Sequence, residues 1–185
     1  MKIAILGWGS LLWDHNTDFD AQHNQWLLDG PELKLEFSRV SQSRSQALTL
    51  VIDSQNGEIC RVAYTFSKRK DPEDAICDLR SREGTTRKNI GFYFCDGSMR
   101  QCRDADSLKA VANWCAIKKV DVVVWTDLES NFKSRCGNDF SIQNALSHIK
   151  GLNAEGKAKA AGYTWRAPDF VQTPLRRILQ VHPWF

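Results

Sequence analysis

The residues best suited to chemistry near the start of the chain form a glycine loop directly after an apolar strand. The run 3–6 is short, apolar and bounded by glycine, which is typical of a buried strand. Gly7 and Gly9 follow it, and glycine permits positive φ and leaves no Cβ to block a ligand. The loop 7–11 therefore offers backbone N–H groups and the Ser10 hydroxyl at a strand end, which suits a small ligand with a carboxylate or carbonyl.

Two other interpretations of this loop remain open. It can be a tight turn that packs Trp8 and Trp13 into the core, since glycine marks turns in every class of protein. It can also be a dinucleotide-binding fingerprint. Against that, Leu12 stands where the fingerprint has its third glycine, and residues 14–18 resemble a loop more than the opening of a helix.

The second residue with evident chemistry is Glu83, which follows a predicted helix over 72–82. Asp71 can cap this helix and Pro72 suits its first position. A carboxylate at the other end lies beside the partial negative charge of the helix C-terminus, which raises its pKa and suits a general acid or base. The alternative is that Glu83 pairs with a neighbouring arginine at the surface.

The two segments together resemble a known family. Gly7-Trp8-Gly9-Ser10-Leu11 is similar to the Gly-Tyr-Gly-Ser-Leu signature of the gamma-glutamylcyclotransferase-like superfamily, with Trp8 in place of the tyrosine. Leu79-Arg80-Ser81-Arg82-Glu83 resembles the Leu-x-x-Arg-Glu motif of the ChaC-like branch, whose glutamate is catalytic. The segment 37–44 looks like the strand Phe-x-x-x-Ser-x-x-Arg of that family. The resemblance covers residues 3–95, whereas the pattern over 120–182 resembles a bacterial branch without a settled substrate.

The resemblance implies an activity that needs no cofactor and no metal. The reaction converts a small gamma-glutamyl compound to 5-oxoproline and a free amine or amino acid, with Glu83 as general acid and base. The substrate-binding residues that it implies are Gly7, Trp8, Gly9, Ser10, Leu11, Arg44 and Arg82. Of these, Arg44 and Arg82 are alternatives for binding the substrate α-carboxylate, because arginine binds carboxylates in a bidentate way. A second function stays open, in which the same fold binds a small ligand without turnover.

Composition excludes several classes of protein. The 185 residues carry a net charge of only +3, which is too balanced for a nucleic-acid partner. No apolar run reaches the length of a membrane span, and the start of the chain has no signal-peptide pattern, so we expect a cytoplasmic monomer or homodimer. The six cysteines form no Cys-x-x-Cys pair, which argues against zinc and predicts buried thiols in a cytoplasmic chain. Cys77 is the candidate for a redox-sensitive thiol, since it lies on the helix near the predicted site.

The elements that must position these residues alternate irregularly between strands and helices. This predicts an α+β fold with a mixed, barrel-like sheet and flanking helices, as the resemblance also implies. We expect a single domain over 1–185, with residues 127–185 as a mostly helical extension. The expected strands are 3–6, 33–37, 47–52, 58–66, 89–95 and 120–126, the second to fourth of them an antiparallel meander. The expected helices are 72–82, 107–115, 139–150, 153–163 and 173–181.

Overall fold

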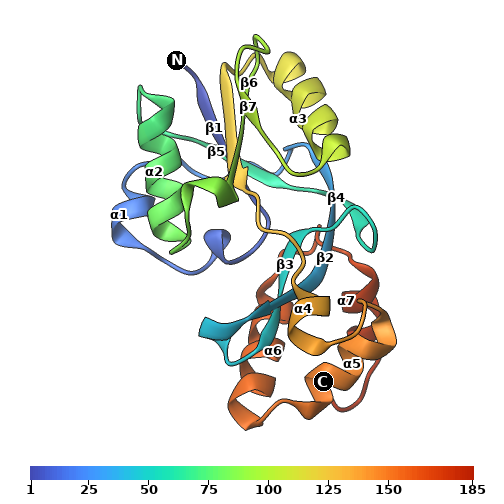
Figure 1. Cartoon of the computed structure of the whole chain (residues 1–185). Helices are drawn as coiled ribbons and strands as arrows, with labels where there is room; N and C mark the ends of the chain where they lie inside the picture. Colours follow the sequence, from blue (N-terminus) through green and yellow to red (C-terminus); the bar gives the residue numbers. More distant parts are fainter. The chain divides into compact units, whose positions relative to one another are not determined.

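The computed structural model describes all residues, 1–185, and shows an α+β protein (Figure 1). The chain forms two compact units. The first comprises Met1–Leu33 and Arg61–Leu128, and the second comprises Lys34–Cys60 and Glu129–Phe185. None of the helices combines the length and the apolar character that a membrane span requires.

The first unit contains a five-stranded mixed sheet in the order β5-β1-β8-β6-β7. The strands are β1 (Ile3–Gly7), β5 (Ala63–Phe66), β6 (Ile90–Phe94), β7 (Arg100–Gln101) and β8 (Val122–Thr126). β1 pairs in parallel with β8 and antiparallel with β5, and β6 pairs antiparallel with β8 and β7. The sheet is open, because β5 and β7 form its two edges, so the prediction of a barrel-like sheet was wrong.

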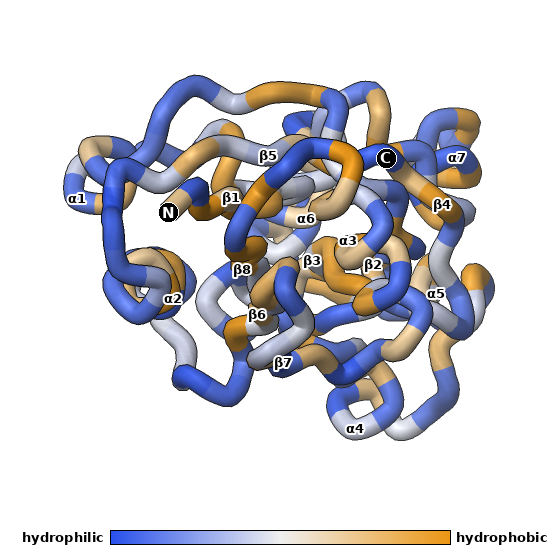
Figure 2. Tube along the Cα trace, turned by 90° about the horizontal axis from the view of Figure 1, so that it is seen from above, coloured by the Kyte–Doolittle hydropathy of each residue, from blue (hydrophilic) through white to orange (hydrophobic).

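Helices cover both faces of this sheet (Figure 1). The short α1 (Thr17–Asp20) and α2 (Pro72–Arg82) lie on one side, and α3 (Ala105–Lys118) lies on the other. Alternate residues of β1 and β8 point toward α2, as the period of a strand requires. They form one apolar core with the buried face of α2: Ile3, Ile5, Val122, Val124, Ala75, Ile76 and Leu79. In Figure 2 these central strands are coloured largely orange, which marks hydrophobic residues.

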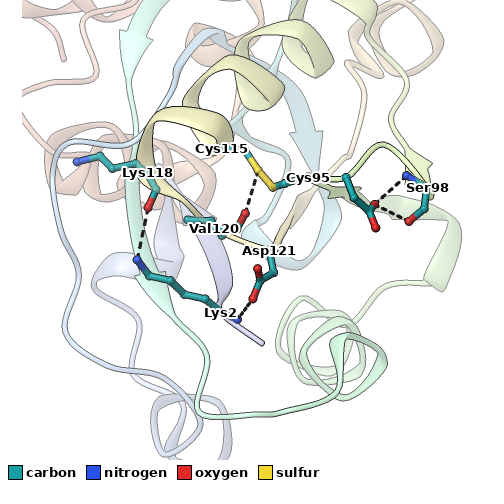
Figure 3. Close-up of a disulfide and its surroundings, with 8 residues drawn as sticks. Lys2, Cys95, Ser98, Cys115, Lys118, Val120 and Asp121 are labelled. Carbon is teal, nitrogen blue, oxygen red and sulfur yellow. Dashed lines mark hydrogen bonds between the residues drawn. A yellow bond between two sulfur atoms is a disulfide. The ribbon is translucent and has the colours of Figure 1, made fainter.

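A disulfide joins the turn after β6 to α3. Cys95 and Cys115 have Cα atoms 6.2 Å apart, a separation that a disulfide can span (Figure 3). Nearby, the backbone N–H of Lys2 donates a hydrogen bond of 2.6 Å to the Asp121 carboxylate. The prediction that the cysteines are thiols was therefore wrong for this pair, because no local sequence pattern indicates that the turn after β6 brings Cys95 next to α3. Cys60, Cys77, Cys102 and Cys136 are free.

The second unit has a three-stranded sheet in the order β3-β2-β4, with the strands β2 (Glu32–Ser41), β3 (Ala47–Ile52) and β4 (Glu58–Arg61). β2 is the central strand, so the predicted meander was wrong in its order. The single strand expected over 58–66 is instead divided between β4 in this sheet and β5 in the other. The division falls at Val62, whose N–H donates to the carbonyl of Pro31.

Four helices follow in the second unit: α4 (Phe132–Cys136), α5 (Ile142–Gly151), α6 (Ala154–Arg166) and α7 (Pro174–Gln180). α6 packs against β3, and α5 packs against α6 and α7. In the core, the rings of Phe37 and Tyr163 meet edge to face with centroids 6.1 Å apart. Asn131 joins the start of α4 to β2, because its side chain accepts from the Val40 N–H at 2.7 Å and donates to the Val40 carbonyl at 3.1 Å.

Candidate functional site

The candidate site lies in the first unit, at the end of the sheet where the carboxyl end of β1 lies. β1 and β8 are parallel, with Ile5 opposite Val124, so the loop after β1 and the residues after β8 emerge at the same end of the sheet. β6 begins at this end of the sheet, because its first residue, Ile90, is opposite Thr126, the last residue of β8. The crevice at the carboxyl ends of parallel strands is a common location for ligand sites.

The glycine loop turns through a short 3₁₀ helix, Ser10–Leu12. The turn is closed by the N–H groups of Leu12, Trp13 and Asp14, which donate to the carbonyls of Gly9 and Ser10. The N–H groups that the sequence predicts as ligand donors, those of Gly9, Ser10 and Leu11, precede these three.

Neither loop glycine adopts positive φ: Gly9 has a φ of −124°, and the three positive-φ glycines all lie elsewhere in the chain. Gly7 instead permits close packing, because a Cβ there would lie 2.8 Å from the ring of Trp26. Trp8 is buried, as expected for a turn that packs tryptophans into the core, but Trp13 is only partly buried, so that interpretation holds for one of its two tryptophans.

α2 ends in a way that fixes the backbone of Glu83. The helix begins as predicted, with the Asp71 side chain accepting from the Glu73 N–H at 3.0 Å and with proline in its first turn. At its other end Glu83 is the capping residue and Gly84 has a φ of +57°. The N–H of Gly84 donates to Ser81, and that of Thr85 donates to Arg80, which together make a Schellman motif.

Arg82 connects the end of this helix to the glycine loop. Its Nη2 donates to the main-chain carbonyl of Ser10 at 3.3 Å and to that of Asp14 at 2.8 Å. Its Nη1 lies 3.8 Å from Oε1 of Glu83, and the two side chains are only 12% and 18% exposed. The structure therefore brings Ser10, Arg82 and Glu83 together. The positive charge of Arg82 faces a carboxylate that would act as a base in its ionised form.

Arg44 belongs to the second unit. It ends the 3₁₀ helix Gln42–Arg44, and its guanidinium lies over the ring of Tyr163, 5.0 Å from the centroid. This is the geometry of a cation–π contact. The role of Arg44 toward a substrate carboxylate stays a prediction.

Sequence reasoning missed a polar network beside the end of β8. The buried carboxylate of Asp127 accepts from the Arg103 N–H at 2.8 Å, and burial raises the pKa of Asp127. Arg103 also donates from Nη2 to Oδ1 of Asn89 at 2.6 Å, and Asn89 donates to the Thr85 hydroxyl at 2.9 Å. The network therefore reaches the segment directly after Glu83. The only signal in the sequence was an acidic residue directly after an apolar strand.

A cavity of about 560 Å³ adjoins the last residues of the glycine loop. Its walls include the indoles of Trp13 and Trp26 together with His15, Asp20 and His23. The Asp20 carboxylate lies 3.4 Å from Nδ1 of His15 and 3.6 Å from Nε2 of His23. Aromatic faces beside a carboxylate can accommodate a small amine or a planar cation. Glu83 is not among the residues that line this cavity.

No group of three or more His, Cys, Asp or Glu side chains in the chain is arranged to hold a metal ion. Comparison with protein-family models, with curated proteins and with solved structures finds no match to this chain.

Proposed function

We propose that this protein is a gamma-glutamylcyclotransferase-like enzyme that acts on a small gamma-glutamyl compound. The substrate's own α-amine attacks its γ-carbonyl carbon, a C–N bond forms in the new ring, and the bond to the leaving amine breaks. The products are 5-oxoproline and a free amine or amino acid. Because the nucleophile is tethered to its target, proximity supplies much of the rate acceleration.

Two tasks remain for the protein. The α-ammonium must lose a proton before it attacks, and the negative charge that develops on the carbonyl oxygen must be stabilised. Glu83 takes this proton and later transfers it to the leaving amine. The attacking nitrogen loses a second proton as the ring closes, and the free amine gains a second proton, so that no net proton is consumed. The N–H groups of Gly9, Ser10 and Leu11, with the Ser10 hydroxyl, bind the γ-glutamyl group or its oxyanion.

The observation that carries this proposal is the contact of Arg82 with the glycine loop. A base and an oxyanion site must be held at a fixed separation, because a displacement of about 1 Å can reduce the rate by roughly two orders of magnitude. Arg82 holds the Ser10 carbonyl with one nitrogen and faces Glu83 with another. The two motifs, 72 residues apart, are therefore joined by one side chain.

This contact also bears on the two candidate arginines. Because Arg82 already donates to two main-chain carbonyls, we assign it chiefly to positioning rather than to the substrate α-carboxylate, and the role of Arg44 stays a prediction. Arg82 retains Nη1 toward Glu83, so a shared role in binding that carboxylate stays within the proposal.

The alternative is a protein that binds a small ligand without turnover, and the cavity of about 560 Å³ is the observation that favours it. Its walls combine aromatic rings with acidic and basic side chains, Lys68 among them, and can bind a small polar ligand without any contribution from Glu83. The two functions make different predictions for a Glu83 variant, because only turnover requires that carboxylate.

The decisive experiment measures release of 5-oxoproline from glutathione, gamma-glutamyl dipeptides, gamma-glutamyl amines and gamma-glutamyl-ε-lysine. We expect release from at least one class of compound, and we expect Glu83→Gln to reduce it by roughly three orders of magnitude or more. Asp74→Asn, which removes an exposed carboxylate from the same helix, is the matched control and should retain wild-type turnover. Binding of a panel member without release, unchanged by Glu83→Gln, would instead support the binding protein.

A further inference from the structure

A cysteine and a histidine face each other in the second unit. Cys136 is the last residue of α4 and His148 lies in α5. The Sγ atom of Cys136 lies 3.4 Å from Nδ1 of His148. The other ring nitrogen, Nε2, lies 2.8 Å from the main-chain carbonyl oxygen of Gln46.

The carbonyl of Gln46 fixes the tautomer of the neutral imidazole. A carbonyl oxygen can only accept, so Nε2 carries the hydrogen and donates it. Nδ1 then presents its lone pair to the Cys136 thiol. This is the arrangement of a nucleophile, a base and a group that orients the base.

Packing holds the imidazole in this orientation. The ring of the buried Phe132 meets the ring of His148 edge to face, with centroids 5.9 Å apart. Phe132 begins the helix that Cys136 ends, so the same short helix supplies the sulfur and an aromatic support for the base.

The pair opens into a cavity of about 280 Å³ that is otherwise lined mainly by polar side chains. Arg135, Asn138, Asn144 and Ser147 line it together with Cys136 and His148. The guanidinium of Arg135 gives the cavity a positive charge, which favours an anionic small molecule.

Burial raises the pKa of the Cys136 thiol, so at neutral pH the sulfur is protonated and becomes nucleophilic when a base removes its proton. Cys77 lies exposed on α2. It therefore provides an internal reference within the same protein.

We propose that Cys136 and His148 form a reactive-thiol site that undergoes exchange with small, carboxylate-bearing disulfides. Thiol–disulfide exchange suits this site because it requires a thiolate and access to a sulfur–sulfur bond. The site is independent of the cyclotransferase reaction, since it uses neither Glu83 nor the glycine loop.

His148 Nδ1 accepts the Cys136 proton as Sγ attacks one sulfur of the disulfide. A bond forms between Sγ and that sulfur, and the bond within the disulfide breaks with its electron pair on the leaving sulfur. His148 returns the proton to the leaving thiolate, so Cys136 is oxidised to a mixed disulfide and one small thiol is released.

The test follows modification of the intact protein by oxidised glutathione at neutral pH, with mass spectrometry to locate the added group. We expect Cys136 to react roughly tenfold or more faster than Cys77, and His148→Gln to remove that advantage while leaving the rate at Cys77 unchanged. Cystamine, a cationic disulfide, should react more slowly than oxidised glutathione at Cys136 but not at Cys77.

Circular dichroism and the unchanged Cys77 rate show whether His148→Gln remains folded, and Cys136→Ser identifies the modified residue. If His148→Gln does not fold, the wild-type protein alone tests the proposal. The test is then the ratio of the Cys136 rate to the Cys77 rate, and the change of that ratio with the charge of the disulfide. Equal rates at the two thiols in the wild type, or faster modification of Cys136 in a folded His148→Gln, would overturn the proposal. In that case the imidazole would only shield the sulfur.

Discussion

The guanidinium of Arg82 donates a hydrogen bond of 2.8 Å to the main-chain carbonyl of Asp14. One donor nitrogen serves both this carbonyl and that of Ser10, so the loop after β1 is held from both ends of its turn. The same guanidinium also presents Nη1 to Glu83, and the single ammonium nitrogen of a lysine cannot reproduce all of these contacts.

We therefore predict that Arg82→Lys reduces turnover more than it reduces stability. The charge beside Glu83 is retained, but the loop is no longer held at its fixed distance from the end of α2. We expect kcat to fall roughly tenfold to a hundredfold and unfolding free energy to fall by about 1–2 kcal/mol. Steady-state kinetics and urea denaturation measure the two quantities on the same samples. Unchanged kcat in a folded Arg82→Lys protein would contradict the positioning role.

Gly84 provides a second test of how Glu83 is positioned. Its φ of +57° is the left-handed conformation, and nothing lies within 4 Å of a Cβ built there. Any cost of Gly84→Ala is therefore conformational rather than steric, and we expect about 1 kcal/mol of lost stability together with a lower kcat.

Gly151→Ala is the matched control for Gly84. Gly151 ends α5, does not have positive φ, and also has open space around the position of a Cβ. Alanine there should leave stability unchanged or raise it by up to about 1 kcal/mol, with no effect on turnover. Thermal unfolding of the two variants, compared with the wild type, separates the two cases. Equal effects at both positions would indicate that the Schellman geometry at Gly84 contributes nothing.

The features that local sequence chemistry determines were predicted well. The start of α2 at Asp71 and Pro72 is confirmed, because a cap and a first-turn proline act within a few residues. β1 and β8 are confirmed as buried strands with slightly different ends. The polar network of Asp127 and Arg103 was missed, because it joins residues 24 apart whose pairing no local pattern encodes.

The arrangement of the strands was less predictable for the same reason. The residues of β4 and β5 form one continuous strand pattern, and nothing in its period indicates that the two halves join different sheets. The five-residue α4 was also missed, because so short a helix depends on tertiary contacts such as those of Asn131 with Val40. For the site, the motifs predicted Glu83 and the loop, but the bridging role of Arg82 required the structure.

The fully buried carboxylate of Glu36 gives the second unit a pH-dependent stability. Its Oε1 accepts from the Phe37 N–H at 2.7 Å, and its Oε2 accepts from the Leu175 N–H at the start of α7, at 3.1 Å. Burial raises the pKa of Glu36 from 4.5 to about 7, in spite of these hydrogen bonds and the Thr173 contact. The folded protein therefore binds a proton at Glu36 over a pH range in which the unfolded chain has released it.

We predict that this proton makes the wild type less stable as pH rises from 4.5 to about 7. The free energy of unfolding falls as pH rises, because the folded state binds more protons than the unfolded state in that window. The stability lost through Glu36 is on the order of 3 kcal/mol. Glu36→Gln cannot titrate, although its amide loses one of the two acceptors. The stability advantage of the wild type over Glu36→Gln should therefore be largest near pH 4.5 and should shrink toward pH 7. Urea denaturation of both proteins across this range measures the difference. A constant difference would show that Glu36 keeps an ordinary pKa, and a growing one would show that its hydrogen bonds outweigh burial.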